Sequence, residues 1–144
     1  YVDPARIGIT GGSYGGYMTL EALFNSSSAF KVGVSDAPVT DWKLYDTIYT
    51  ERYMGTPQNN PDGYKSSSPV NQAASVKGKL MLIHGTGDDN VHFANSIELL
   101  NALIDSGRYP DKLMIFPGRG HGISDPAARV LLIRSSMDYI LNNL

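Results

Sequence analysis

Residues 7–16 read Ile-Gly-Ile-Thr-Gly-Gly-Ser-Tyr-Gly-Gly, a short apolar run followed by a glycine-rich turn around one serine. The apolar run predicts a buried strand over Ile7–Thr10. A helix is predicted after the glycines, because Tyr17, Leu20 and Phe24 recur at helical spacing and share one face. A strand, a tight turn and a helix in this order are typical of the repeating unit of an α/β fold.

The remainder of the chain alternates between strand and helix patterns in the same way. The clearest strand pattern is Leu80–His84, which lacks polar alternation, as is typical of a parallel strand covered on both faces. We therefore predict an α/β fold with a mostly parallel sheet. The other predicted strands are Lys31–Ser35 and Leu113–Phe116; the predicted helices are Asp41–Tyr53, the segment around Phe93, Ile97, Leu100 and Ile104, and a last helix from the Asp125-Pro126 cap to about Asn142; a loop is predicted over Thr56–Gly63.

Composition limits the classes of function. The chain has 144 residues, about the length of one domain, and a net charge of −2 with its charges scattered, which disfavours binding to nucleic acid or to an anionic membrane. No apolar run approaches the ~18 residues of a membrane span. The absence of cysteine excludes disulfides, thiolate nucleophiles and cysteine-ligated zinc. Two serine tracts, Ser26–Ser28 and Ser66–Ser68, predict short loops.

The glycine-rich turn fits the pattern G-x-S-x-G from Gly11 to Gly15. A serine on such a strand-to-helix turn holds its hydroxyl clear of the sheet, and the glycines let neighbouring backbone pass without Cβ clashes. The backbone N–H of Tyr14 is then available to an oxyanion at the helix start. The alternative is a turn whose serine, Ser13, only caps the helix. A phosphate-binding loop is disfavoured, because no Gly-Lys-Ser/Thr follows.

A nucleophilic serine needs a base, and the chain has three histidines. His84 ends a buried strand, and His92 lies near a helix start. His121 lies in the glycine-rich loop of residues 118–122, directly after the last predicted strand, from which an imidazole can reach a site at the strand ends. We interpret His121 as the base, and the alternative is an exposed loop histidine.

The acid is expected in a loop after an intervening strand. Residues 85–90, Gly-Thr-Gly-Asp-Asp-Asn, offer Asp88 and Asp89. Adjacent aspartates in such a loop are often plain turn formers, and the spacing of a calcium loop is absent. The order Ser, Asp, His is that of the α/β-hydrolases, and each member follows a strand, so all three are expected at one sheet edge. The sequence therefore predicts a serine hydrolase.

Several stretches together resemble the prolyl oligopeptidase family of serine peptidases, most closely its dipeptidyl peptidase IV branch. The matching stretches are Ser13–Tyr17, Ala37–Val39, Tyr49–Gly55, His84–Thr86 with Asp88–Phe93, and His121–Ile123. The resemblance implies an α/β-hydrolase fold and makes Asp88 the acid of a triad with Ser13 and His121. Gly12 departs from the branch, which usually has Trp there, and the Gly-Gly-Ser-Tyr-Gly-Gly run is also similar to acylaminoacyl peptidases.

The resemblance also implies a substrate pocket. An apolar and aromatic cavity is matched by Tyr14, Val39, Trp42, Tyr45, Tyr49 and Val91, and Asn90 matches a residue that hydrogen-bonds a substrate carbonyl. From the residues alone, the rings at positions 42, 45, 49 and 53 form a helical stripe, which is either core or pocket wall.

The activity implied by the resemblance is hydrolysis of short peptides after Pro or Ala near the N-terminus, through an acyl-enzyme on Ser13. No metal or organic cofactor is implied, and the expected partner is a peptide substrate, with dimerisation through the last helix in similar proteins. The alternatives are an acylaminoacyl peptidase or esterase of the same fold, and a non-catalytic binding homologue. Residues 1–144 are expected to be the C-terminal part of the catalytic domain, inactive alone, without the β-propeller of the family. The resemblance favours a periplasmic or secreted location.

Overall fold

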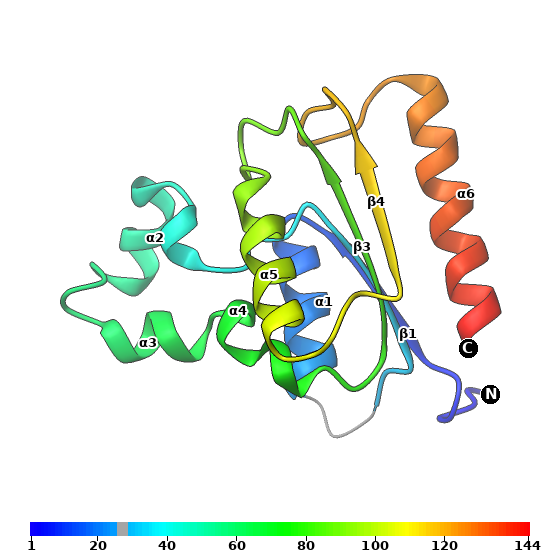
Figure 1. Cartoon of the computed structure of the whole chain (residues 1–144), viewed down its shortest axis with the longest axis horizontal. Coiled ribbons are helices and arrows are strands. Elements are labelled where there is room, and N and C mark those ends of the chain that lie inside the picture. Colours follow the sequence, from blue (N-terminus) through cyan, green and yellow to red (C-terminus); the bar gives the residue numbers. More distant parts are fainter. Residues whose placement is uncertain (26–28) are drawn as a thin grey trace.

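The computed structural model describes residues 1–25 and 29–144, so the predicted loop at Ser26–Ser28 lies outside the described residues. The described chain contains one sheet of four parallel strands, in the order β1-β2-β3-β4 (Figure 1). The predicted α/β class with a parallel sheet is confirmed. The strands are β1 (Gly8–Gly12), β2 (Val32–Asp36), β3 (Lys79–Gly85) and β4 (Lys112–Phe116).

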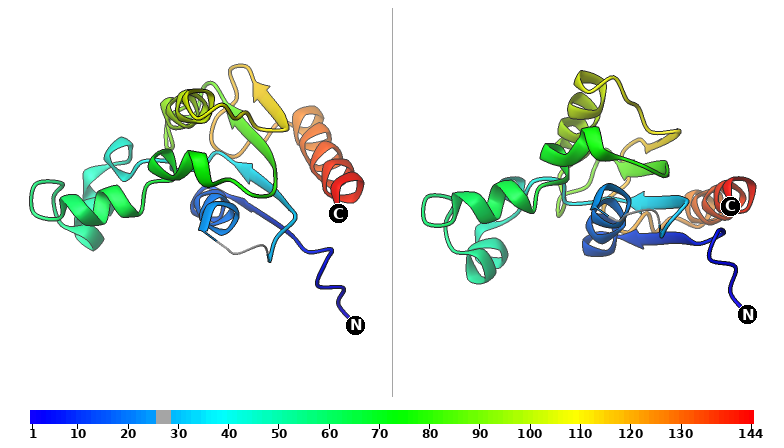
Figure 2. Two further views of the ribbon diagram at one scale, coloured as in Figure 1. Left: turned by 60° about the horizontal axis from the view of Figure 1, so that its bottom comes forward. Right: turned by 90° about the horizontal axis from the view of Figure 1, so that it is seen from below.

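Helices cover both faces of the sheet (Figures 1 and 2). The three long helices are α1 (Tyr14–Asn25), α5 (Ala94–Asp105) and α6 (Pro126–Asn143). One core cluster joins Leu80 and Leu82 of β3 to α1 and α5, and the other joins Met81 and Ile83 to α6. Successive side chains of a strand point to opposite faces, so β3 is buried on both sides, as its unbroken apolar sequence predicts.

The helix faces match the sequence pattern in α1 but not in α5. Tyr17, Leu20 and Phe24 of α1 are buried, as predicted. In α5 the expected face was wrong at Ile97 and Ile104, which are 39% and 56% exposed. The polar first turn of α5 is buried instead, because its side chains hydrogen-bond partners outside the helix.

The segment between β2 and β3 is more broken than predicted. Its elements are the 3-10 turns η1 (Trp42–Leu44) and η2 (Ala73–Ser75) and the short helices α2 (Thr47–Met54), α3 (Pro61–Ser66) and α4 (Pro69–Gln72). The single helix predicted over Asp41–Tyr53 is wrong, because the carboxylates of Asp41 and Asp46 each accept a backbone N–H and start a separate helical turn. Tyr45, between the two turns, is extended.

Two predicted loops in this segment also contain helix. The loop predicted over Thr56–Gly63 ends early, because the side chain of Asn60 accepts the N–H of Gly63 and Pro61 begins α3. In the tract Ser66–Ser68, the first serine ends α3 and the other two connect it to α4. Together α2 and α3 project away from the sheet, beyond the end of α1 (Figure 1). No helix among residues 1–25 and 29–144 is long and apolar enough to cross a membrane.

Candidate active site

The loops after β1, β3 and β4 carry Ser13, Asp88 and His121 to the same end of the sheet. The strands run parallel, with Gly12 of β1 beside Asp36 of β2 and the end of β3 beside the end of β4. Asp36 connects the three residues, because its backbone oxygen accepts the N–H of Ser13 at 2.9 Å and its carboxyl lies in the field of both His121 and Asp88.

Ser13 occupies a left-handed backbone conformation, with φ of 58°. Such a conformation is uncommon for a residue with a side chain and marks a sharp turn, here between β1 and α1. The glycines around it are sterically required at two positions. A Cβ on Gly11 would overlap the backbone of Gly15, and one on Gly16 would lie 2.7 Å from the backbone oxygen of Asp36. The motif is therefore explained by close backbone approach as well as by chemistry.

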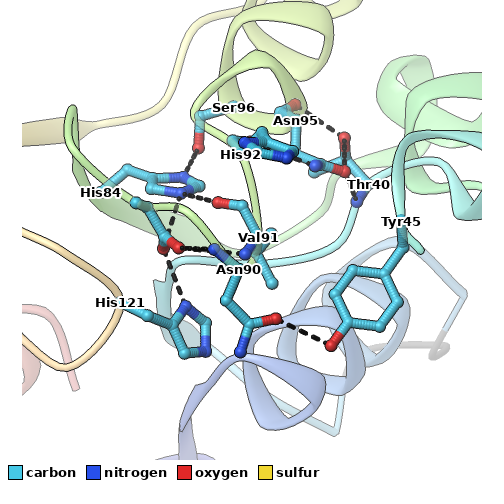
Figure 3. A network of polar contacts seen from close by, with 10 residues as sticks. Thr40, Tyr45, His84, Asn90, Val91, His92, Asn95, Ser96 and His121 are labelled. Carbon is cyan, nitrogen blue, oxygen red and sulfur yellow. Dashed lines mark hydrogen bonds and ion pairs between the residues drawn. The ribbon is translucent and has the colours of Figure 1, made fainter. Parts of the chain in front are cut away.

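Asp88 is held by hydrogen bonds to both of its carboxylate oxygens. Its side chain is buried, and Oδ1 accepts the backbone N–H groups of Asn90 and Val91, both at 3.0 Å. Its Oδ2 lies 2.8 Å from Nδ1 of His121 (Figure 3). Asp89, the other candidate, is exposed and points the comparison toward Asp88.

The orientation of His121 defines which of its ring nitrogens is free to act. A carboxylate only accepts, so Nδ1 carries the proton and Nε2 keeps the lone pair in the neutral ring. The side chain is 25% exposed. Its loop is anchored by Ile123, which is buried at a φ of 39°, and by a hydrogen bond from Gly118 N–H to Oγ1 of Thr86. Within the described chain no hydrogen bond joins His121 to the hydroxyl of Ser13.

Three of the six predicted pocket residues line one cavity of about 690 Å³. They are Tyr14, Trp42 and Tyr49, and the cavity is further lined by Tyr17, Thr50, Tyr53, Met54, Gly63, Ser66 and Ser67. The ring of Trp42 is at the centre of the cluster, with its centroid 5.0 Å from that of Tyr17 and stacked on Tyr49 at 6.1 Å. The aromatic stripe is thus packed against the core on one side and open on the other.

The other predicted pocket residues lie elsewhere. Val39 and Val91 are 2% and 0% exposed and pack behind Trp42 in the core. Tyr45 lies beside the loop of Asn90 and donates its hydroxyl proton to Oδ1 of Asn90 at 2.8 Å (Figure 3). These two residues border a separate hollow of about 480 Å³.

Two titratable residues next to the site were not predicted to belong to it. The carboxyl of Asp36 is largely buried, which raises its pKa to about 6, and its Oδ1 has no hydrogen-bond partner among the described residues. His84 is fully buried, and burial lowers the pKa of its imidazole. The available signal was position alone, since both residues stand at or near the end of a predicted strand.

Solved structures with this architecture are dipeptidyl peptidases by title. The crystal structure of Porphyromonas gingivalis dipeptidyl peptidase 4 matches with a TM-score of 0.96 at 42% identity, covering 100% of this chain and 20% of that chain. A putative dipeptidyl aminopeptidase IV from Bacteroides ovatus matches with the same TM-score at 40% identity and the same coverage. The described residues therefore have the α/β-hydrolase fold.

Sequence comparison identifies the family. Dipeptidyl aminopeptidase B of Saccharomyces cerevisiae is 46% identical over 141 residues, which are 96% of this chain and 17% of the yeast protein. The sequence model of the prolyl oligopeptidase family matches residues 1–144. The chain belongs to the prolyl oligopeptidase family. It spans 17% to 20% of the length of these relatives.

Proposed function

We propose that this chain carries the catalytic triad of a serine dipeptidyl peptidase, with Ser13 as nucleophile, His121 as base and Asp88 as acid. The observation that carries the proposal is the 2.8 Å contact between Nδ1 of His121 and the buried carboxylate of Asp88, at the sheet end where Ser13 occupies its strained turn. Membership of the prolyl oligopeptidase family supports it.

The proposed mechanism is acyl transfer in two halves. Oγ of Ser13 attacks the scissile carbonyl carbon while Nε2 of His121 takes the hydroxyl proton. The same proton then passes to the leaving amine as the carbon–nitrogen bond breaks, which leaves an acyl-enzyme. Water repeats the sequence to release the acid. Asp88 holds the ring in the correct tautomer and stabilises its charged form.

The oxyanion of each tetrahedral intermediate needs donors. The backbone N–H of Tyr14 is the donor that we propose from this chain, because α1 begins there and the first N–H groups of a helix have no partner within the helix. The chemistry as proposed uses side chains and backbone only.

For the substrate, we propose short peptides cut after Pro or Ala near the N-terminus. The cavity beside Trp42 and Tyr49 has apolar ring walls, which suit the compact proline ring because that residue brings no N–H to be left unpaired. Tyr14 links this cavity to the nucleophile turn. Asn90, with Tyr45, is proposed to bind the carbonyl of the preceding residue. The names of the relatives support the dipeptidyl part of the proposal.

We further propose that residues 1–144 form the C-terminal part of the catalytic domain of a longer protein. The short share of each relative that the chain covers supports this. Helix α6 supports dimerisation, because it exposes a row of apolar side chains at Val130, Ile133, Met137 and Leu141.

The test uses the full-length protein and a fluorophosphonate probe. We expect the probe to label Ser13, identified by peptide mass spectrometry, and labelling to vanish in Ser13→Ala. Matched amides then separate the substrate classes: a free-amine Xaa-Pro amide is expected to be cleaved far faster than an N-acylated amino-acid amide or a simple ester. Faster cleavage of the acylated amide would favour an acylaminoacyl peptidase, and absence of labelling would identify a binding homologue.

A further inference from the structure

A second histidine contacts the carboxylate of Asp88. Nε2 of His84, at the end of β3, lies 3.3 Å from Oδ2 of Asp88, the same oxygen that His121 approaches at 2.8 Å. The side chains of His84 and Asp88 are both fully buried. The imidazole rings of His84 and His121 therefore share one carboxylate oxygen, with the backbone N–H groups on the other oxygen (Figure 3).

The remaining contacts of His84 fix its tautomer. Nε2 lies 2.8 Å from the backbone oxygen of Val91, which can only accept, so Nε2 carries the proton. Nδ1 lies 2.7 Å from Oγ of Ser96, in the first turn of α5, and accepts the proton of that hydroxyl. Burial lowers the pKa of His84, which keeps the ring neutral. The N–H of a neutral ring is thus directed between Val91 and Asp88.

We propose that His84 is a positioning residue for the acid, which donates its Nε2–H to Oδ2 of Asp88 and is itself held by Ser96. This inference rests on the proposed function, since the role of Asp88 is part of it. A donor on Oδ2 fixes the rotation of the carboxylate, so that the oxygen stays aligned with Nδ1 of His121. It also withdraws part of the negative charge, so that His121 holds its second proton less tightly and becomes free as a base at lower pH.

A purely structural reading of His84 makes a different prediction. In that reading the chain from Ser96 through His84 to Val91 only ties α5 to the loop after β3, and its loss lowers stability alone. Thr40 provides the matched control, because its buried hydroxyl donates to the backbone oxygen of Asn95, one residue from Ser96, and the hydrogen bonds of Thr40 do not include Asp88. Thr40→Val removes a comparable buried hydrogen bond from the same turn of α5.

The experiment compares His84→Leu, His84→Gln, Ser96→Ala and Thr40→Val in the full-length protein. Active sites are titrated with the fluorophosphonate, so that every rate is expressed per labelled Ser13. Turnover of an Xaa-Pro amide is measured from pH 5 to 9 to locate the midpoint of the acid limb. The other titratable groups that sense Asp88 are Asp36 on β2 and Tyr45, and both are unchanged in all four variants.

We expect His84→Leu to lower kcat by about 10- to 100-fold, the scale of one hydrogen bond to a charged group. Its acid-limb midpoint moves up by about 0.5 pH unit, because the carboxylate left with one donor fewer holds the proton on His121 more tightly. His84→Gln, whose amide can donate to the same oxygen, recovers most of the rate and the parental midpoint. Ser96→Ala moves the midpoint in the same direction by less, and Thr40→Val leaves it unchanged.

Two results overturn the inference alone: parental kcat and midpoint in His84→Leu, or losses in His84→Leu and His84→Gln that match each other and leave the midpoint unmoved. If His84→Leu yields no labelled protein, Ser96→Ala decides, and an unmoved midpoint there overturns the inference. Failure of the probe to label Ser13 in the parent overturns the proposed function, and the role of His84 with it.

Discussion

The two halves of the proposed site are held by different forces. The strand-end loops (residues 12–14, 85–91 and 117–123) are fixed by left-handed backbone angles, required glycines and a buried carboxylate with donors on both oxygens. The aromatic segment (residues 41–67) is a set of short helical turns joined mainly by ring packing around Trp42. The first region has one arrangement that works. The second can change its rings and keep its architecture, so we assign rate to the loops and selectivity to the segment.

The largest expected effect lies in the strand-end loops. Ser13→Ala and His121→Ala in the full-length protein should each lower kcat by about 10⁶-fold, with the double variant little worse, because the residues act as a unit. Turnover of an Xaa-Pro amide measures this, with Ser136→Ala on α6 as a control that keeps parental activity. Losses that multiply in the double variant would show that the two residues act separately.

The next effect separates the two adjacent aspartates. Asp88→Asn should lower kcat by about 10⁴-fold, because an amide at this position favours the wrong tautomer of His121. Asp89→Asn should have little effect, since its side chain is exposed and outside the hydrogen bonds of the site. The measurement is kcat/KM for both variants on one substrate, and greater damage from Asp89→Asn would reverse the assignment.

A smaller effect is expected in the aromatic segment. The parent should prefer Pro over Ala by roughly 10- to 200-fold, the scale of a few lost methylene contacts. Tyr49→Ala enlarges the cavity, so the preference should decline and larger residues should be accepted. The exposed Ile48 on the same helix gives the control Ile48→Ala.

The readout for this variant is kcat/KM on three matched amides that differ only in Pro, Ala or Phe before the cut. Equal values for Pro and Phe in the parent contradict the pocket assignment. A loss of turnover for all three substrates by the same factor would place Tyr49 among the residues that set rate, and would remove the distinction between the two regions.

The smallest effect concerns stability at the sheet end. Burial raises the pKa of Asp36 from 3.8 to about 6, so the folded state binds this proton more tightly than the unfolded state does. The associated stability is present below pH 3.8 and is lost as the pH rises through about 6. Asp36→Asn should therefore gain unfolding free energy relative to the parent between pH 4 and 6. Denaturant unfolding at several pH values measures the difference, and Asp105→Asn at an exposed position should show no such trend.

The strand-end loops were predictable from the sequence because their signals are local. A serine between glycines requires a sharp turn, and the apolar runs before Ser13, Asp88 and His121 are strands that end at one edge. The α/β class follows from the same runs. From the residues alone the choice between Asp88 and Asp89 stayed open, because only the folded loop determines which carboxylate points inward.

The aromatic segment and the inner face of α5 were not predictable in the same way. The spacing from Trp42 to Tyr53 suits one helix, but the caps formed by Asp41 and Asp46 compete with it locally. In α5 the burial of Ser96 depends on His84, a partner from another element. Periodicity counts apolar residues and carries no information on a polar group that becomes buried because a distant side chain satisfies it.

The backbone angle of Ser13 sets function against stability. A left-handed conformation costs a residue with a Cβ about 1–2 kcal/mol, which glycine avoids. Ser13→Gly, although inactive, should therefore melt at a higher temperature than the equally inactive Ser13→Ala, a comparison that thermal unfolding measures directly and that an equal or higher melting temperature of the alanine variant would contradict. Selection for stability alone would replace the nucleophile with glycine, so keeping serine at this turn requires selection for what its hydroxyl does.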